Sequence, residues 1–90
     1  MDEAQFQQVA KALSDAHRLH ILEMLKENER MHCGAVVDRL SLAQATVSHH
    51  LKELVNAGLL QVERDGQFNH YTLNTDTLDT YTAELRRRFL

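Results

Sequence analysis

The sequence predicts a mainly α-helical domain with a β-hairpin wing, in the order α-α-α-α-β-β-α, which is a winged helix-turn-helix. Three observations favour this fold class. Apolar residues recur at helical spacing up to about residue 56. Residues 59–73 instead have the pattern of two short strands. A last amphipathic helix follows, and the 90 residues together suit a single domain, 1–90, for DNA binding and dimerisation.

The first two helices are predicted from their apolar faces. In residues 4–13 the apolar side chains three or four positions apart are Phe6, Val9, Ala10 and Leu13. Ser14 or Asp15 can then cap a second helix, because short polar side chains accept hydrogen bonds from the free N–H groups of a first helical turn. This second helix carries the apolar residues of segment 19–25 and fades in the charged segment 26–30.

A pair of helices joined by a short turn is predicted next. The first covers about residues 33–40, and residues 41–43 are long enough only for a turn. The second covers about residues 44–56, and Ala57-Gly58 ends it as a glycine C-cap. Its predicted inward face consists of Val47, Leu51, Leu54 and Val55.

The remaining elements form the wing and a final helix. Strands are predicted over Leu59–Arg64 and Phe68–Leu73, with Asp65-Gly66 as a strong hairpin signal between them. Asn74 or Thr75 starts the last helix, whose apolar residues recur at helical spacing up to residue 89.

Composition excludes several classes of protein. The 43% hydrophobic and 26% charged residues suit a globular chain and argue against disorder. No apolar run approaches the roughly 20 residues of a membrane-spanning helix, and the acidic first residues do not resemble a secretory signal. The single cysteine cannot form an intrachain disulfide, so we expect a cytoplasmic protein. Phosphate-loop, nucleophile-elbow and zinc-hydrolase motifs are missing, so we do not expect an enzyme.

The polar face of the helix at 44–56 suits the major groove of DNA. The Gln44 amide can pair with an adenine edge, Ala45 can approach a thymine methyl, and Lys52 can reach a phosphate. Arg64, in the wing at 62–72, can enter a minor groove or contact a phosphate. The predicted DNA-binding residues are Gln44, Ala45, Thr46, Ser48, His49, Lys52, Arg64 and Gln67.

The charge distribution is less typical of a nucleic-acid-binding protein. The formal net charge is −3, whereas such domains are often basic. The positive residues expected on the DNA face are Arg39, Lys52 and Arg64, with His49 and His50 nearby. The acidic residues concentrate in segments 2–3, 23–29 and 76–79, so we expect moderate affinity with a shallow salt dependence.

Several stretches resemble the ArsR/SmtB family of bacterial winged-helix repressors. They are Ala12–Leu22 (ALSDAHRLHIL), Thr46–Lys52 (TVSHHLK), Ala57–Leu59 (AGL), Gly66 and His70–Leu73 (HYTL). The resemblance extends over about residues 5–75. It implies a dimeric repressor that leaves DNA when an inducer, often a metal ion, binds.

The chain also departs from the family pattern. Many relatives have proline where Ala16 and Ala45 stand, and a serine N-cap where Ala43 stands. Losing a serine cap costs about 1 kcal/mol, so the recognition helix is expected to start less firmly here. Asn69 occupies a strand position that is usually apolar.

A homodimer is expected from the first and last helices. Their apolar residues have little of this small domain left to cover them, and the resembled family places its dimer contact there. The alternative is that both helices only cap their own domain. The expected partners are double-stranded DNA and a second copy, with an interface of Phe6, Val9, Leu13, Leu78, Tyr81, Leu85 and Phe89.

An effector site is harder to find. The Cys-x-Cys positions of some relatives fall on His32 and Gly34, which leaves Cys33 expected as a buried small hydrophobe. A second family metal site falls on the non-ligating residues Thr75, Thr77 and Arg88. His17 and His20, three residues apart, offer only two ligands. We therefore expect no metal and no cofactor. Two alternatives stay open: a metal- or thiol-responsive derepressor using His32 and Cys33, and a winged-helix module for protein–protein contact.

Overall fold

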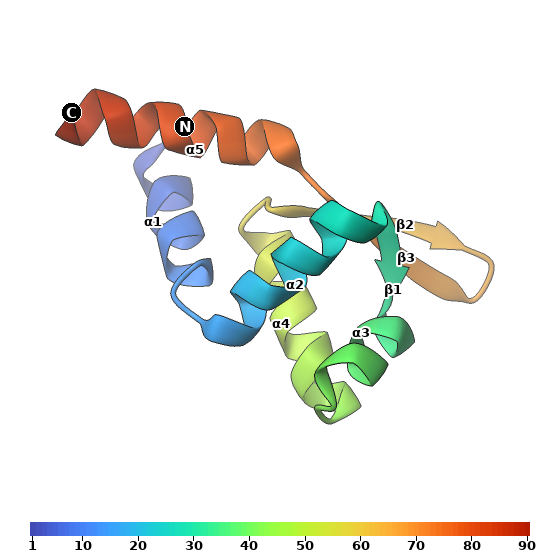
Figure 1. Ribbon diagram of the computed structural model, residues 1–90. Coiled ribbons are helices and arrows are strands. Elements are labelled where there is room, and N and C mark those ends of the chain that lie inside the picture. Colours follow the sequence, from blue (N-terminus) through green and yellow to red (C-terminus); the bar gives the residue numbers. More distant parts are fainter.

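The computed structural model describes all 90 residues as five helices and one three-stranded sheet. Figure 1 shows α2, α3 and α4 in the body, the β2–β3 hairpin projecting from one side, and α5 lying across the far end above α1. The predicted mainly helical winged helix-turn-helix is confirmed. The elements are α1 Glu3–Ala12, α2 Ala16–Asn28, β1 Arg30–His32, α3 Cys33–Leu40, α4 Gln44–Asn56, β2 Leu60–Asp65, β3 Phe68–Leu73 and α5 Thr75–Phe89.

The predicted element order omitted one strand. β1 pairs antiparallel with β3, and the sheet has the order β1-β3-β2. Met31 lies opposite Tyr71, and His32 lies opposite His70. A strand of three residues is too short to show an alternating pattern of its own. Its existence depends on pairing with β3, which is far away in the sequence.

The hairpin also differs slightly from the prediction. The two-residue loop is Gly66-Gln67 rather than Asp65-Gly66, because Asp65 still pairs with Phe68. Gly66 has φ +62°, a left-handed conformation that glycine adopts without a Cβ penalty. β2 therefore extends one residue further towards the tip than predicted.

The helix ends follow local capping chemistry. Asp15, and not Ser14, caps α2 by accepting from the Arg18 N–H at 3.0 Å. As predicted, Ala43 gives α4 no side-chain cap. The predicted glycine C-cap of α4 is confirmed as a Schellman arrangement: Gly58 has φ +81°, and the Leu59 N–H donates to the Leu54 carbonyl at 3.0 Å.

The core lies between α1, α2, α3, α4 and the inner face of the sheet. Val47, Leu51 and Leu54 of α4 are fully buried, while Val55 is only half-buried. The fourth inward position of α4 is His50, which is buried although the charge pattern assigned it to the DNA face. That assignment is wrong, because α2 packs against α4 along the side that carries His50.

Candidate nucleic-acid interface

The structure leaves every predicted DNA-binding side chain of α4 exposed to solvent. With about 100° between successive residues, Ser48 lies about 40° to one side of Lys52, and His49 about 60° to the other. The exposed residues are Gln44, Ala45, Thr46, Ser48, His49 and Lys52. The opposite side of the same helix is closed by the core, so α4 has one free polar face.

A hollow of about 580 Å³ lies between α3, α4 and the wing on the Ser48 side of α4. Gln44 and Ser48 of α4 line it together with Gln67 and Asn69 of the wing. We call it the wing hollow. Asn69 was not among the predicted contacts. The sequence did offer one sign of a contact role for Asn69, namely a polar side chain at a strand position that is usually apolar.

Arg64 and Gln67 are both exposed at the wing tip. Arg64 lies opposite Asn69 in the β2–β3 pairing. Directly opposed residues share one face of a sheet, so Arg64 lies on the face to which Asn69 belongs. The wing thus carries its tip cation on the same face of the sheet as Asn69, which lines the wing hollow.

His50 links α4 to the start of α2. Its Nδ1 lies 3.4 Å from Arg18 Nη1 and 3.9 Å from Asp15 Oδ2. Burial lowers the pKa of His50, although the Asp15 carboxylate opposes that shift. The backbone N–H of Arg18 lowers the pKa of Asp15 by hydrogen bonding to the carboxylate. A neutral imidazole therefore holds α4 against α2 at neutral pH.

Cys33 and His32 lie at the start of α3. Cys33 is half-buried against the core, more exposed than expected, and burial raises the pKa of its thiol. A protonated thiol is a poor nucleophile and a poor metal ligand. His32 Nδ1 accepts from the Ala35 N–H at 3.3 Å and so caps α3. No group of three or more His, Cys, Asp or Glu side chains converges to hold a metal ion.

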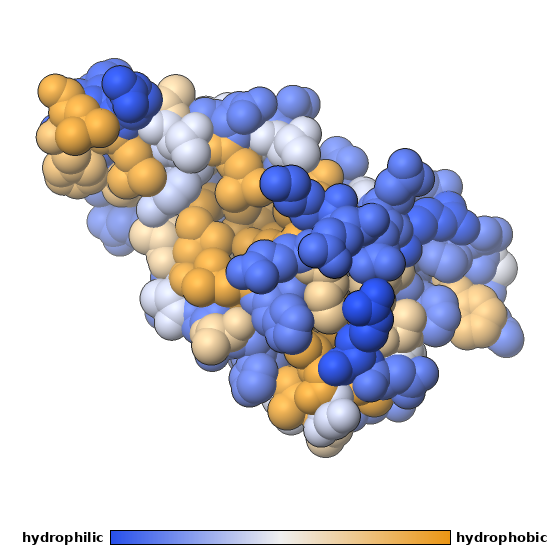
Figure 2. Space-filling model, viewed as in Figure 1, coloured by the Kyte–Doolittle hydropathy of each residue, from blue (hydrophilic) through white to orange (hydrophobic).

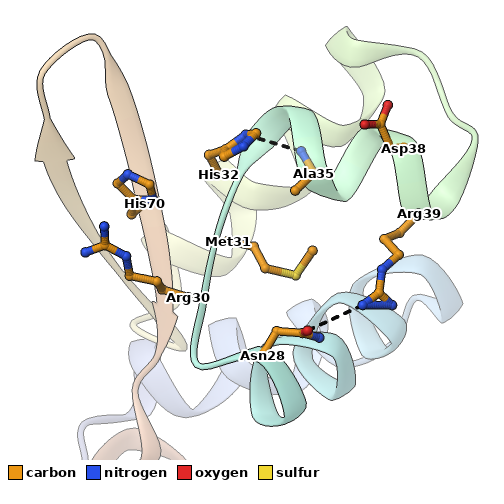
Figure 3. A pocket seen from close by; sticks show the side chains of 8 residues that line it. All are labelled: Asn28, Arg30, Met31, His32, Ala35, Asp38, Arg39 and His70. Atoms are coloured by element: carbon orange, nitrogen blue, oxygen red, sulfur yellow. Dashed lines mark hydrogen bonds between the residues drawn. The ribbon is translucent and has the colours of Figure 1, made fainter.

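A polar pocket at β1 lies between the wing and helices α2 and α3. Figure 3 shows this pocket straddling β1, with Arg30 and His70 on the wing side and Arg39 beside Asn28 on the other. Arg30 pairs with Asp65 of β2 at 3.5 Å, and Arg39 donates to Asn28 Oδ1 at 3.4 Å. Arg39 therefore lines this pocket, whose lining includes no residue of α4.

The residues predicted for a dimer interface fall into two groups. Val9 is fully buried within its own protomer, and Phe6 and Tyr81 are nearly so, with ring centroids 5.2 Å apart. The other four keep exposed area: Leu13, Leu78 and Leu85 are half-buried, and Phe89 is 70% exposed. Figure 2 shows hydrophobic residues at the free end of α5 and along the face below it.

Arg88 joins the two terminal helices. Its guanidinium lies 3.9 Å from the Phe6 ring centroid and pairs with Glu3 of α1 at 2.7 Å and Glu84 of α5 at 3.0 Å. Arg87 also pairs with Glu84. The two arginines lower the pKa of Glu84 to about 2. The basic end of α5 is thus partly engaged in holding α1.

Comparison with known proteins gives consistent matches. Residues 13–63 match a family model described as a helix-turn-helix domain. The chain is 39% identical over 70 residues to the transcriptional repressor SdpR of Bacillus subtilis strain 168, covering 78% of this chain and 77% of that protein. It is 36% identical over 77 residues to the arsenical resistance operon repressor of Staphylococcus aureus, covering 86% and 73%.

A solved structure adds information on assembly. The homodimeric winged helix-turn-helix DNA-binding domain Mb0332 from Mycobacterium bovis, a possible ArsR-family regulator, superposes with a TM-score of 0.78 at 26% identity. The match covers 90% of this chain and 75% of that one. In the present structure no helix is long and apolar enough to cross a membrane.

Proposed function

Because the chain belongs to the ArsR/SmtB family of winged helix-turn-helix transcriptional regulators, we propose that it represses transcription as a homodimer on a palindromic operator. Family membership confirms the prediction of a DNA-binding regulator rather than an enzyme. The proposal adds the direction of regulation, the dimer and the mode of DNA contact. Its relatives include repressors, and a related domain is a homodimer.

The proposed DNA contact is α4 in the major groove, with the wing on the minor groove or the backbone. One observation carries it: α4 is fully buried along Val47, Leu51 and Leu54 and free along its Gln, Ser, His and Lys face. A helix with side chains is about 10–12 Å across, which matches a major groove about 12 Å wide. Amide and hydroxyl groups on that face suit base edges.

The proposed dimer uses the exposed parts of α1 and α5, chiefly Leu13, Leu78, Leu85 and Phe89. Leu13, Leu78 and Leu85 pack against the core cluster that includes Phe6 and Tyr81, and Phe89 is 70% exposed. A two-fold dimer presents two copies of α4 to two half-sites. Their centres should lie one helical turn apart, roughly 34–36 Å.

The test compares base-reading with phosphate-binding residues. Gln44→Ala should lose about 1–3 kcal/mol of discrimination at particular base pairs, because its amide is proposed to pair with a base edge. Lys52→Ala should weaken binding to all sequences alike and flatten the salt dependence. Binding is measured by gel shift and fluorescence anisotropy on duplexes selected by the wild-type protein and on random duplexes.

Identical behaviour of the two variants on selected and random DNA would contradict the assignment of roles. Failure of the wild-type protein to select any duplex would contradict sequence-specific binding itself. Transcription from a promoter carrying the selected duplex then tests repression, which should be relieved when the protein is omitted.

A further inference from the structure

Another hollow, of about 290 Å³, lies on the flank of α4 opposite the wing hollow. It is bounded by Gln8, Lys11, Ala12, Arg18, His49 and Glu53. We call it the α1–α4 hollow. Three of these six residues are basic or can become so, and they come from α1, α2 and α4. The wing takes no part in it.

We propose that the α1–α4 hollow binds a backbone phosphate of DNA, with Lys11 as the main contact and His49 beside it. This inference rests on the proposed function, because it requires α4 to enter a major groove. It adds a contact that the sequence pattern did not indicate, from the first helix rather than from the helix-turn-helix or the wing.

The position of the hollow on the recognition helix supports a phosphate ligand. A major groove has a row of backbone phosphates on each side. A helix that fills the groove therefore brings each of its two flanks close to one of these rows. On the Ser48 flank the wing supplies Arg64. On the His49 flank the only basic side chains bordering the hollow are Lys11 and Arg18 with His49 itself.

Lys11 is free for this contact, whereas Arg18 is occupied. The Lys11 side chain is exposed, and its ammonium group has no hydrogen bond or ion pair within the protein. Arg18 donates from Nε to the Ala12 carbonyl at 2.8 Å and from Nη2 to the Lys11 carbonyl at 3.2 Å. Arg18 therefore acts as a positioning residue that holds the end of α1, and with it Lys11, beside α4.

Glu53 opposes phosphate binding in the hollow. Glu53 is half-buried and lines the same hollow, so its carboxylate repels an anion that enters. The phosphate is thus expected at the Lys11–His49 rim rather than deep beside Glu53. The acidic group also supplies a second test, because neutralising it should act in the opposite direction from removing the lysine.

The experiment measures the dissociation constant of the full-length dimer for a selected duplex between 50 and 200 mM KCl. Lys11→Ala should remove one phosphate contact per protomer and lower the log–log salt slope by about 1.8 per dimer. Its affinity deficit relative to wild type should therefore shrink by about 12-fold across that salt range. Lys11→Arg should restore the wild-type slope. Lys26→Ala is the control: it removes a lysine near the end of α2, away from the hollow, and should leave the slope unchanged.

Position is tested with duplexes that carry one uncharged methylphosphonate at a time. At one backbone position per half-site the substitution should weaken wild-type binding and have no further effect on Lys11→Ala. Glu53→Gln should tighten binding, and the gain should shrink as salt rises. Equal melting midpoints of these variants would show that the substitutions did not change the fold.

The inference is overturned if Lys11→Ala keeps the wild-type slope and remains sensitive to the same methylphosphonates, or if Glu53→Gln binds no tighter. In either case the proposed function still stands if Gln44→Ala loses base discrimination. If the wild-type protein binds no duplex, both the proposed function and this inference fail.

Discussion

Helices α4 and α5 differ in how fully their apolar residues are covered within the protomer. The inner face of α4 carries three side chains with no exposed area, whereas Tyr81 is the only buried residue of α5. The last residues, Phe89 and Leu90, are 70% and 92% exposed. The inner face of α4 is thus closed within the protomer, while the α1–α5 end leaves apolar surface exposed to solvent.

This contrast implies that changes at the two ends have different consequences. Substitutions on the inner face of α4 should reduce the stability of each protomer. Substitutions on the exposed part of α5 should leave the protomer folded and change its assembly, and through assembly its DNA affinity. The following predictions test that separation in order of decreasing effect.

The largest effect is expected from Leu78→Glu combined with Leu85→Glu. Charged side chains in the proposed interface should give folded monomers, because both residues are only half-buried in the protomer. Loss of the linked second half-site should reduce operator affinity by about 10²–10⁴-fold. Sedimentation velocity reports the assembly and circular dichroism the fold.

Val62→Glu is the matched control for assembly, because it changes an exposed apolar residue of the wing, 47% exposed. Its sedimentation coefficient should stay at the dimer value. If the Leu78/Leu85 variant also sedimented as a dimer, the α5 surface would not be the interface.

The next largest effect is expected inside α4. Leu51→Ala removes a fully buried side chain and leaves a cavity, which should lower the free energy of unfolding by about 2–5 kcal/mol. Thr46→Ala, at an exposed position of the same helix, should change it by less than about 0.5 kcal/mol. Urea denaturation measures both. A loss below about 1 kcal/mol for Leu51→Ala would show that this core is not closed within the protomer.

A smaller effect, of opposite sign, is expected at the start of α4. Ala43 occupies the N-cap position and makes no side-chain hydrogen bond to the first turn. Ala43→Ser should supply that acceptor and raise the free energy of unfolding by about 0.5–2 kcal/mol, whereas Ala43→Val, which adds no acceptor, should bring no such gain. Urea midpoints of the two variants should therefore differ. Equal midpoints would mean that another group already satisfies the first-turn N–H groups.

Local sequence patterns predicted α4 closely and missed features that depend on distant contacts. The period of Val47, Leu51 and Leu54, with Gly58 after them, was enough for the ends of the helix. β1 escaped prediction because its three residues become a strand only by pairing with β3. His50 looked like a surface histidine because imidazole is polar.

The candidate site was also predictable only where it depends on local sequence patterns. Exposed residues of α4 and the wing follow from helical and strand periodicity. The α1–α4 hollow does not, because Lys11, Arg18 and His49 belong to three helices and meet only when α1 and α2 pack against α4. The side-chain burial of His50 arises from that same packing, and it leads to the last prediction.

The smallest effect is a pH dependence of stability caused by His50. Its neighbours are Asp15 and Arg18 at the start of α2, with His17 on α2 and His49 on α4 also near. Because burial lowers its pKa below the usual 6.5, the unfolded chain binds a proton more readily than the folded one as the pH falls below 6.5. The stabilisation is therefore complete above 6.5 and lost towards acid pH, with a slope of at most about 1.4 kcal/mol per pH unit for each protomer.

Urea denaturation at pH 7.5, 6.5 and 5.5 measures this slope, and His50→Gln is the informative variant. Glutamine keeps an oxygen that can accept from Arg18 but does not titrate, so the variant should be less sensitive to pH than the wild type. Asp15 does not interfere in this window, because its pKa is lowered from an ordinary value of 3.8 and its contribution disappears only in stronger acid. If His50→Gln kept the full wild-type dependence, the proton would be taken up elsewhere. The buried imidazole would then be a packing group and not the cause of acid sensitivity in the α2–α4 contact.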